Sequence, residues 1–298
     1  MKILATGLSG LVGSRIEELL KDRYEFDSST ENITDKNLIT SRITNSDADV
    51  VLHLAAKTDV DGCEKDKALE KEGDAWKVNV MGTENVASAC SNSGKKIIYI
   101  STDFIFDGEK EGGYEENDLP NPVNWYGQTK LEGEKMVQGC SADYIIARIA
   151  YPYKRSLKTP LENEFSSSAY RKNFPRKDFL SGLIEKIKIG KSLKMITDHV
   201  MTPTFIDDIA FALKTLIDTN QNGVFHVVGS QAITPYETAI LIADVFGFDK
   251  SNIGKTTRED FFRDKAKRGY NLYLKNDKIG KLGIKMKTLE EGIKEIKG

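Results

Sequence analysis

The chain has 298 residues, enough for one large α/β domain or two smaller domains with a full hydrophobic core. Its formal net charge is -2, from 43 basic and 45 acidic residues, so no overall positive field favours nucleic acid or an anionic membrane as a partner. No apolar stretch approaches the roughly 20 residues of a membrane span, and early glycines and charges make the N-terminal segment unlike a signal peptide.

The cysteines also indicate where the protein works. Cys63, Cys90 and Cys140 are scattered, with no Cys-x-x-Cys pair and no histidine at metal-binding spacing. Such a pattern is typical of isolated thiols in a reducing compartment. We therefore expect a cytoplasmic protein without a metal site.

The N-terminal stretch predicts a dinucleotide site. An apolar run at residues 2–6 leads into Gly7-Leu-Ser-Gly10-Leu-Val-Gly13, and an amphipathic segment follows to residue 20. Glycines let the backbone approach a pyrophosphate, and the helix N-terminus offers free N–H groups. The spacing is G-x-x-G-x-x-G, not G-x-G-x-x-G, but its place between strand and helix favours cofactor binding over a simple tight turn.

Asp27 closes the next short apolar run, about 20 residues past the glycines, where an acidic side chain would accept hydrogen bonds from an adenosine ribose. It also suits the start of a turn with Ser28 and Ser29, and the two roles are compatible. Residues 28–31 contain no Arg or Lys that could neutralise a 2′-phosphate. The pattern therefore favours NADH over NADPH.

Residues 49–56 form a continuous apolar run, as expected for a strand that is covered on both faces. His53 lies inside it, and we interpret this histidine as a packed core residue. Residues 58–74 are charged and irregular, which predicts a loop that includes at most a short helix. A longer helix is expected near residues 75–93.

The centre of the chain contains the strongest catalytic pattern. The strand predicted at residues 96–100 ends in Ser101-Thr102-Asp103, and hydroxyls at the carboxyl end of a parallel strand face the ligand crevice. A polar loop follows, and then Tyr126 and Lys130 lie four residues apart in a predicted helix, on one face. An ammonium near a phenol lowers the phenol pKa from about 10, so we expect a proton-donating Tyr126. A fifth apolar run covers residues 144–148.

Beyond residue 148 the pattern changes. Residues 151–178 are too long for an ordinary connection, and we interpret them as either a substrate-side lid or a solvated charged loop. Their basic side chains suit a phosphate-bearing substrate: Lys154, Arg155, Lys158, Arg171, Lys172, Arg176 and Lys177. We expect a helix at 179–189, strands near Met195 and at 223–228, a helix after 203–209, and capping boxes at Thr234 and Thr288.

Taken together, these motifs resemble the extended short-chain dehydrogenases/reductases, and within them most closely the dTDP-4-dehydrorhamnose reductases. The resemblance spans nearly the whole chain. The motifs identify the family jointly, and few of them would do so alone. The residues that carry it are the glycine turn, Asp27 with residues 32–35, residues 53–64, 79–85 and 101–108, residues 122–130 with Gly133 and Glu134, and residues 203–209.

The resemblance implies a Rossmann-like doubly wound parallel sheet with a smaller, discontinuous C-terminal substrate domain. Residues 1–150 would bind NAD(P), with 204–228 returning to that domain, and residues 151–203 and 229–298 would form the substrate domain. The implied activity is NAD(P)H-dependent reduction of a nucleotide-linked 4-keto-6-deoxy sugar, in dTDP-rhamnose biosynthesis. The partner is a nucleotide-diphosphate sugar, and the oligomeric state stays open, with a homodimer among the options.

The resemblance also assigns roles to residues. Thr102 would bind the substrate carbonyl, Tyr126 would donate the proton, and Lys130 would lower the Tyr126 pKa and hold the nicotinamide ribose. Thr102, Asp103, Phe104 and Tyr151 would contact the substrate. The cofactor would lie along Gly7, Ser9, Gly10, Leu11, Val12, Gly13, Asp27, Ile33, Leu54, Ala55, Ala56, Lys57, Asn79, Ser101, Tyr126 and Lys130.

Two departures from the family pattern matter. Tyr151 stands near a position where the family usually has Trp, which leaves the particular sugar open, and Ser28 stands where relatives often have Arg, which again favours NADH. Two other functions remain open. One is a nucleotide-sugar epimerase or dehydratase on the same scaffold, and the other is a non-enzymatic subunit like the regulatory subunit of methionine adenosyltransferase.

Overall fold

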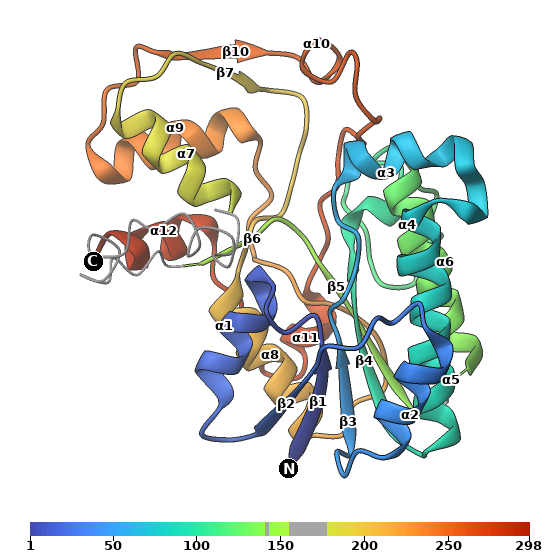
Figure 1. The fold of residues 1–298 in the computed structure, drawn as a ribbon. Helices are drawn as coiled ribbons and strands as arrows, with labels where there is room; N and C mark the ends of the chain where they lie inside the picture. The colour runs from blue at the N-terminus through green and yellow to red at the C-terminus, as the bar shows by residue number, and fades with distance from the viewer. Residues whose placement is uncertain (141–142, 155–177) are drawn as a thin grey trace, which may run out of the picture.

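The structure is a computed structural model and describes residues 1–140, 143–154 and 178–298. Its centre is a six-stranded parallel sheet (Figure 1). The described strands are β1 (Lys2–Thr6), β2 (Glu25–Ser29), β3 (Val50–His53), β4 (Lys96–Thr102), β5 (Tyr144–Ile149), β6 (Pro152–Tyr153), β7 (Leu193–Ile196), β8 (Thr204–Phe205), β9 (Gly223–His226) and β10 (Ile253–Thr256). The order across the central sheet is β2-β1-β3-β4-β5-β9.

Helices cover both faces of this sheet. The described helices are α1 (Leu11–Leu20), α2 (Lys36–Thr44), α3 (Val60–Asp66), η1 (Lys67–Glu72), α4 (Asp74–Trp76), η2 (Lys77–Gly82), α5 (Thr83–Asn92), η3 (Asp103–Ile105), α6 (Trp125–Cys140), α7 (Phe179–Lys188), α8 (Ile206–Asp218), α9 (Pro235–Phe246), α10 (Arg258–Phe261), α11 (Asp277–Gly280) and α12 (Leu289–Lys297).

The sequence explains the two covered faces. Successive side chains of a strand point to opposite faces, so Ile3 and Ala5 pack in one core with α1 and α8, while Leu4 packs in another with α2, α5 and α6. All three side chains are buried. A strand with no solvent face requires the continuous apolar run seen in the sequence. The predicted doubly wound parallel sheet is therefore confirmed.

One stretch is more helical than expected. Residues 58–74, interpreted as mostly a loop, contain α3 and the 3-10 helix η1. Asp59 caps α3 by accepting a hydrogen bond from the backbone N–H of Gly62 at 3.1 Å. The sequence allowed for a short helix in this stretch but not for η1 as well. Helix α3 buries only Cys63 fully, and so lacks the apolar period of a longer amphipathic helix.

A smaller unit lies above the carboxyl ends of the central strands in Figure 1. It contains α7, α9, α12 and the parallel pair β7–β10, which share a separate apolar core. The capping boxes predicted at Thr234 and Thr288 are confirmed at the starts of α9 and α12. The basic lid predicted for residues 151–178 lies largely outside the described residues, which resume at Asp178.

The chain passes between the two units more than once. After β7 it returns to the central sheet, where α8 packs beside α1 and β9 pairs with β5. Near the C-terminus, Ile279 and Met286 pack in the core of the sheet, and α12 then packs in the smaller unit. Segments distant in sequence therefore meet around the space between the units.

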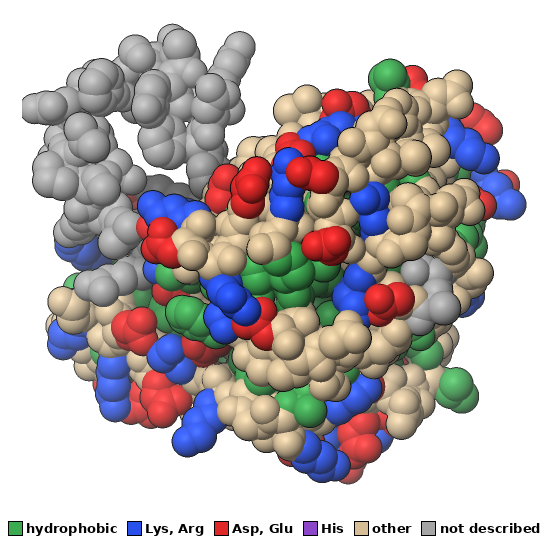
Figure 2. Space-filling view, turned by 90° about the horizontal axis from the view of Figure 1, so that it is seen from below, with side chains coloured by type: hydrophobic (Ala, Val, Ile, Leu, Met, Phe, Trp, Pro, Cys, Tyr) green, Lys and Arg blue, Asp and Glu red, His purple; other side chains and the backbone are tan. Residues whose placement is uncertain are grey.

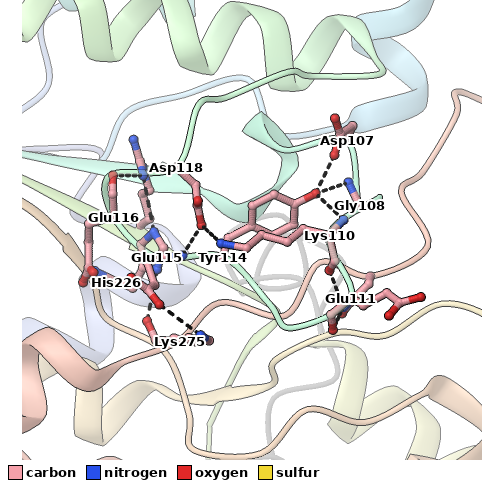
Figure 3. A network of polar contacts seen from close by, with 12 residues as sticks. Asp107, Gly108, Lys110, Glu111, Tyr114, Glu115, Glu116, Asp118, His226 and Lys275 are labelled. Atoms are coloured by element: carbon pink, nitrogen blue, oxygen red, sulfur yellow. Dashed lines mark hydrogen bonds and ion pairs between the residues drawn. The ribbon is translucent and has the colours of Figure 1, made fainter.

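A polar network holds the segment between β4 and α6 (Figure 3). The Tyr114 hydroxyl accepts a hydrogen bond from the backbone N–H of Gly108 at 2.9 Å. Glu116 Oε1 accepts from the backbone N–H of His226 at 2.9 Å, and Nδ1 of His226 lies 3.1 Å from the carbonyl oxygen of Lys275. The network ties this segment to β9 and to the C-terminal part of the chain.

The surface in Figure 2 shows acidic and basic side chains interspersed on the face turned to the viewer. Neither sign forms a continuous field there, which agrees with the net charge of -2. No helix in the described ranges has the length and apolar character needed to cross a membrane.

Candidate active site

The glycine turn follows β1 at a topological switch point, because β2 lies on one side of β1 and β3 on the other. Gly7 has φ 71°, and a Cβ there would lie 2.6 Å from the backbone nitrogen of Ala55. A Cβ at Gly13 would lie 2.5 Å from the carbonyl oxygen of Leu8. Steric constraints therefore require glycine at both positions. Helix α1 begins here without a side-chain cap, which leaves free N–H groups for an anionic ligand.

A cavity of about 1160 Å³ lies at the carboxyl ends of β1, β3, β4 and β5 and extends to the smaller unit. It brings together most of the residues predicted from the sequence. These are Gly7, Ser9, Gly10, Leu11, Val12, Gly13, Leu54, Ala55, Ala56, Ser101, Thr102, Asp103, Phe104, Tyr126, Lys130 and Tyr151.

Two predicted cofactor residues lie behind the wall of this cavity. Asn79 is fully buried, and its amide accepts from the backbone N–H of Lys57 at 2.8 Å and donates to the Lys57 carbonyl at 3.0 Å. The Lys57 ammonium is 2.7 Å from Asp66. Asn79 and Lys57 thus fix the segment after β3 that forms the wall, without lining the cavity themselves.

Two further predicted cofactor residues also lie outside the cavity lining. Ile33 is buried, and its side chain is close to Gly82, where an added Cβ would be 2.7 Å from Ile33 Cδ1. Asp27 lies in the middle of β2 and forms an ion pair with Arg42 of α2. The sequence argument considered only residues 28–31 as sources of positive charge, and the fold supplies Arg42 from 15 positions away.

The catalytic candidates lie on α6, which packs closely on the turn after β4. A Cβ at Gly127 would be only 2.0 Å from the carbonyl oxygen of Phe104. Tyr126 and Lys130 are both buried and line the cavity. The Lys130 ammonium donates to the carbonyl of Ile100 at 2.8 Å and lies 4.0 Å from the centre of the Tyr99 ring.

The pKa of Tyr126 is not lowered by Lys130, as the sequence had predicted it would be. Burial raises the pKa of Tyr126, a hydrogen bond with Thr102 opposes that rise, and Lys130 is not among the causes. The expectation of a lowered Tyr126 pKa is therefore wrong for this structure, because the Lys130 ammonium lies on Tyr99 and Ile100. Burial also lowers the pKa of Lys130, to about 7.

The end of β4 contains two polar atoms that suit a bound ligand. Ser101 Oγ and Asp103 Oδ2 are buried and have no hydrogen-bond partner among the described residues. Buried polar groups are costly unless they are hydrogen-bonded. With the glycine turn beside them, these atoms fit a cofactor and a polar substrate in the cavity.

The opposite wall contains residues that the sequence analysis did not find. His199 is buried, with Nε2 2.8 Å from the Tyr151 hydroxyl and Nδ1 2.8 Å from the carbonyl oxygen of Gly269. Arg268 forms an ion pair with Asp61 of α3 at 2.6 Å. No spacing signal could reveal these pairs, because their members are 48, 70 and 207 positions apart.

Tyr151 itself has a backbone conformation rare for a non-glycine residue, with φ 42°. Its ring packs edge-on against Phe179, and its hydroxyl bonds to His199. Non-glycine residues in this region cluster at functional sites, where the surrounding structure holds them. The conformation places an aromatic ring and a hydroxyl in the lining of the cavity.

Metal ligands and reactive thiols form no further site in the part of the chain that the structure describes. No group of three or more His, Cys, Asp or Glu residues there is arranged to hold a metal ion. Cys63, Cys90 and Cys140 are free, and burial raises the pKa of Cys63 to about 11 and that of Cys90 to about 12.

Comparison with known families matches residues 1–297 to the model described as RmlD substrate binding domain. Among curated proteins, a probable low-salt glycan biosynthesis reductase of Haloferax volcanii is 29% identical over 98% of this chain and 96% of its own. A dTDP-4-dehydrorhamnose reductase of Aggregatibacter actinomycetemcomitans is 31% identical, over 82% and 78%. Methionine adenosyltransferase 2 subunit beta of Pongo abelii is 30% identical, over 99% and 86%.

Two similar solved structures are dTDP-4-dehydrorhamnose reductases. A dTDP-4-dehydrorhamnose reductase of Clostridium acetobutylicum has a TM-score of 0.84 and 31% identity, with 99% of this chain and 98% of that chain covered. The enzyme of that name from Bacillus anthracis, in complex with NADP, has a TM-score of 0.84 and 25% identity, with the same coverage.

Proposed function

The chain belongs to the RmlD substrate binding domain family, and from that membership we propose that it is an NAD(P)H-dependent reductase of a nucleotide-linked 4-keto-6-deoxy sugar, like dTDP-4-dehydrorhamnose reductase. One observation supports the proposal most strongly. A single cavity joins the glycine turn at Gly7 to Thr102, Tyr126 and Lys130. The expected dinucleotide site and the expected proton donor would thus share one space.

The residues of the cavity would divide the reaction between them. The nicotinamide cofactor supplies a hydride when it is bound, and the glycine turn and the N-terminus of α1 would bind its pyrophosphate. The Thr102 hydroxyl would position the ketone, and Tyr126 would meet the charge that develops on its oxygen with a proton. The Lys130 ammonium, which lies 4.0 Å from the centre of the Tyr99 ring, would bind the nicotinamide ribose.

The finer cofactor preference is also part of the proposal, and we expect NADH to bind at least as well as NADPH. Arg42 forms ion pairs with two carboxylates, Asp27 and Glu31. Lys2 also lies 3.8 Å from Asp27 but pairs with Glu25 and Asp47 as well, so carboxylates still outnumber cations there. A 2′-phosphate near Asp27 would meet that excess of negative charge. Replacing Asp27 by Ala and Ser28 by Arg should shift the preference toward NADPH in binding titrations, and a strong wild-type preference for NADPH would contradict this assignment.

The remaining assignments follow the same family. We propose that residues 1–150 and 204–228 bind the cofactor and that residues 151–203 and 229–298 bind the nucleotide-diphosphate sugar. The pairing of β9 with β5 supports the return of 204–228. Ile279 and Met286 pack in the core of the sheet, so residues 229–298 would also contribute to the cofactor domain. Three free cysteines fit the reducing cytoplasm predicted from the sequence.

Two alternatives require a direct test. An epimerase or dehydratase would return the hydride and show no net oxidation of NADH. A regulatory subunit has a specific observation in its favour, the similarity to methionine adenosyltransferase 2 subunit beta. Such a subunit would bind a partner enzyme without turning over a keto sugar.

The deciding experiment follows NADH and NADPH absorbance when purified protein receives dTDP-4-dehydrorhamnose. We expect stoichiometric oxidation of the cofactor and formation of a 4-hydroxy sugar. Conversion of the sugar without net oxidation would favour the epimerase. No turnover of any keto sugar, together with binding to a methionine adenosyltransferase catalytic subunit, would favour the regulatory function.

A further inference from the structure

Asn124 lies immediately before α6, two residues from Tyr126, and has no role in the reaction described so far. Its side chain is only 4% exposed and is not part of the cavity lining. The side-chain oxygen, Oδ1, accepts from the backbone N–H of Gly127 at 2.8 Å, which is the usual hydrogen bond of a residue that caps a helix N-terminus. One half of the amide therefore serves α6.

The other half of the amide binds a distant segment. Nδ2 of Asn124 donates to the backbone carbonyl of Lys267 at 2.9 Å, across 143 positions of the chain. A helix cap needs only an acceptor, which serine, threonine or aspartate supplies as well. Asparagine adds an NH2 donor beside that acceptor. The residue type thus fits a double contact, to α6 and to the segment around Lys267.

Residues 266–269, called the strap from here on, are also held by α3. Asp61 accepts from the backbone N–H of Ala266 at 3.2 Å and forms an ion pair with Arg268 at 2.6 Å. Arg268 is buried and lines the cavity. The strap is thus fixed to the proposed cofactor domain on both sides of the carbonyl that Asn124 binds.

The far end of the strap reaches the opposite wall of the cavity. Nδ1 of His199 lies 2.8 Å from the carbonyl oxygen of Gly269, and Nε2 lies 2.8 Å from the Tyr151 hydroxyl. The backbone is also closely packed here, because a Cβ on Gly269 would be 2.5 Å from the carbonyl oxygen of Asp107. Hydrogen bonds and one short backbone segment therefore connect the helix that carries Tyr126 to the wall that contains Tyr151.

We propose, on the basis of the reductase function above, that Asn124 is a positioning residue: it holds the strap against α6 and so fixes the distance between the opposite wall and the Tyr126 phenol. A sugar bound against that wall would then present its ketone to the phenol. Asn124 acts through the strap and through the first turn of α6, where Tyr126 is the second residue.

The chemistry of the proposed reaction makes this distance important. A proton donor must lie within about 3 Å of the oxygen that it protonates, and a misplacement of about 1 Å can lower the rate about 10²-fold. A strap released from Asn124 would keep its contacts with Asp61 and His199, so the wall would still form. Loss of the Asn124 contact should therefore lower kcat more than it weakens binding of the sugar.

Asn124→Ser tests this contact, because a serine hydroxyl still caps α6 but lacks the NH2 group that holds the Lys267 carbonyl. On dTDP-4-dehydrorhamnose, kcat should fall by about 10- to 100-fold, while KM rises only a few-fold and NADH affinity stays the same. Asn276→Ser is the matched control, since Nδ2 of Asn276 also donates to a distant carbonyl, that of Val228 at 3.0 Å, but away from the cavity. It should keep the wild-type kcat. A wild-type kcat in Asn124→Ser would overturn the proposal.

A double-mutant cycle separates positioning from simple damage to α6. Asp61→Ala loosens the strap from the α3 side, leaves the cap of α6 in place, and should itself lower kcat. If both residues act through the strap, the fall in kcat of the double variant should be smaller than the product of the two single effects. A fall equal to that product would mean that Asn124 acts on α6 alone, and would overturn the proposal.

A third measurement requires no turnover and uses dTDP as the probe. Hydrogen exchange in the first turn of α6 should slow when dTDP binds to the wild-type protein, because a ligand against Arg268 would steady the strap and, through Asn124, the helix. Asn124→Ser should still bind dTDP but show no such slowing. No slowing in the wild type, or equal slowing in both proteins, would overturn the proposal. Slowing in a wild-type protein that reduces no keto sugar would keep the link through the strap and refute only the proposed function.

Discussion

The two walls of the cavity are built in different ways. On the sheet side, the main element is backbone, because Gly7 and Gly13 leave no room for a side chain and α1 begins directly behind them. On the opposite side, the wall consists of side chains such as Tyr151, His199 and Arg268, which arrive from separate segments. Local chain geometry specifies the first wall, whereas long-range packing assembles the second.

This difference predicts which properties a substitution in each wall should change. A change in the backbone wall should damage the fold and cofactor binding together, since the same atoms serve both. A change in the side-chain wall should alter substrate binding and leave the cofactor affinity nearly unchanged. Substitutions on the two sides can therefore test whether the two walls differ in this way.

The largest effect is expected behind the sheet, where Arg148 of β5 and Glu134 of α6 form a buried ion pair at 2.8 Å. Arg148→Met would leave the Glu134 carboxylate buried without its partner, and should lower the free energy of unfolding by about 3–5 kcal/mol. Lys214→Met, which removes an exposed i,i+4 pair with Asp218, should cost less than about 1 kcal/mol. Denaturant unfolding measures the free energy of unfolding of both variants. If both lose the same amount, burial of the ion pair does not determine how much its loss destabilises the protein.

A glycine from each wall gives the next comparison. Gly7→Ala forces a left-handed alanine, which alone costs about 1–2 kcal/mol, and brings its Cβ within 2.6 Å of the Ala55 nitrogen. It should lower both unfolding free energy and NADH affinity. Gly182→Ala lies in α7, where no atom is within 4 Å of the added Cβ, and should stabilise the protein by about 0.5–1 kcal/mol. A well-folded Gly7→Ala protein with wild-type NADH affinity would contradict the backbone account.

The buried histidines predict how stability depends on pH. Burial lowers the pKa of His53, which bonds to Thr6, to about 3, and that of His226 to about 3. The unfolded chain then binds protons below pH 6.5 that the folded chain excludes, so stability rises with pH between about 3 and 6.5 and falls on acidification. Each such histidine should cost about 1.4 kcal/mol per pH unit in that window. Unfolding free energies at several pH values measure the slope, and a flat profile would contradict buried neutral rings.

The smallest effect is expected from one hydroxyl on the side-chain wall. Tyr151→Phe removes the hydrogen bond to His199, which is worth about 0.5–1.5 kcal/mol. The KM for the nucleotide sugar should rise a few-fold while NADH affinity stays the same. Tyr153→Phe is the control, because the Tyr153 hydroxyl is buried without a partner among the described residues and its loss should be neutral or stabilising. An equal KM change in both variants would argue against a specific Tyr151 contact.

The same contrast explains what the sequence could predict. The glycine turn, the Ser101-Thr102-Asp103 run and the spacing of Tyr126 and Lys130 are local patterns, and the structure brings all of them to one cavity. The parallel sheet followed from continuous apolar runs, and the core position of His53 followed from its place within one of them.

What the sequence could not predict depends on contacts between distant segments. Arg42 reaches Asp27 from another element, and the Lys130 ammonium lies on Tyr99 instead of lowering the pKa of Tyr126. His199 and Arg268 join the site through partners far away in the chain. Residue type and spacing carry no record of such pairs, because only the fold decides which side chains meet.

Tyr126 is proposed to donate the proton to a sugar ketone at the meeting point of the two walls. Tyr126→Phe removes only the phenolic hydroxyl, so the direct test compares its kcat with that of the wild type on dTDP-4-dehydrorhamnose, at saturating NADH. We predict unchanged NADH affinity and a kcat lower by about 10²- to 10⁴-fold, the usual contribution of general acid catalysis. A Tyr126→Phe protein that reduces the keto sugar at the wild-type rate would contradict the account.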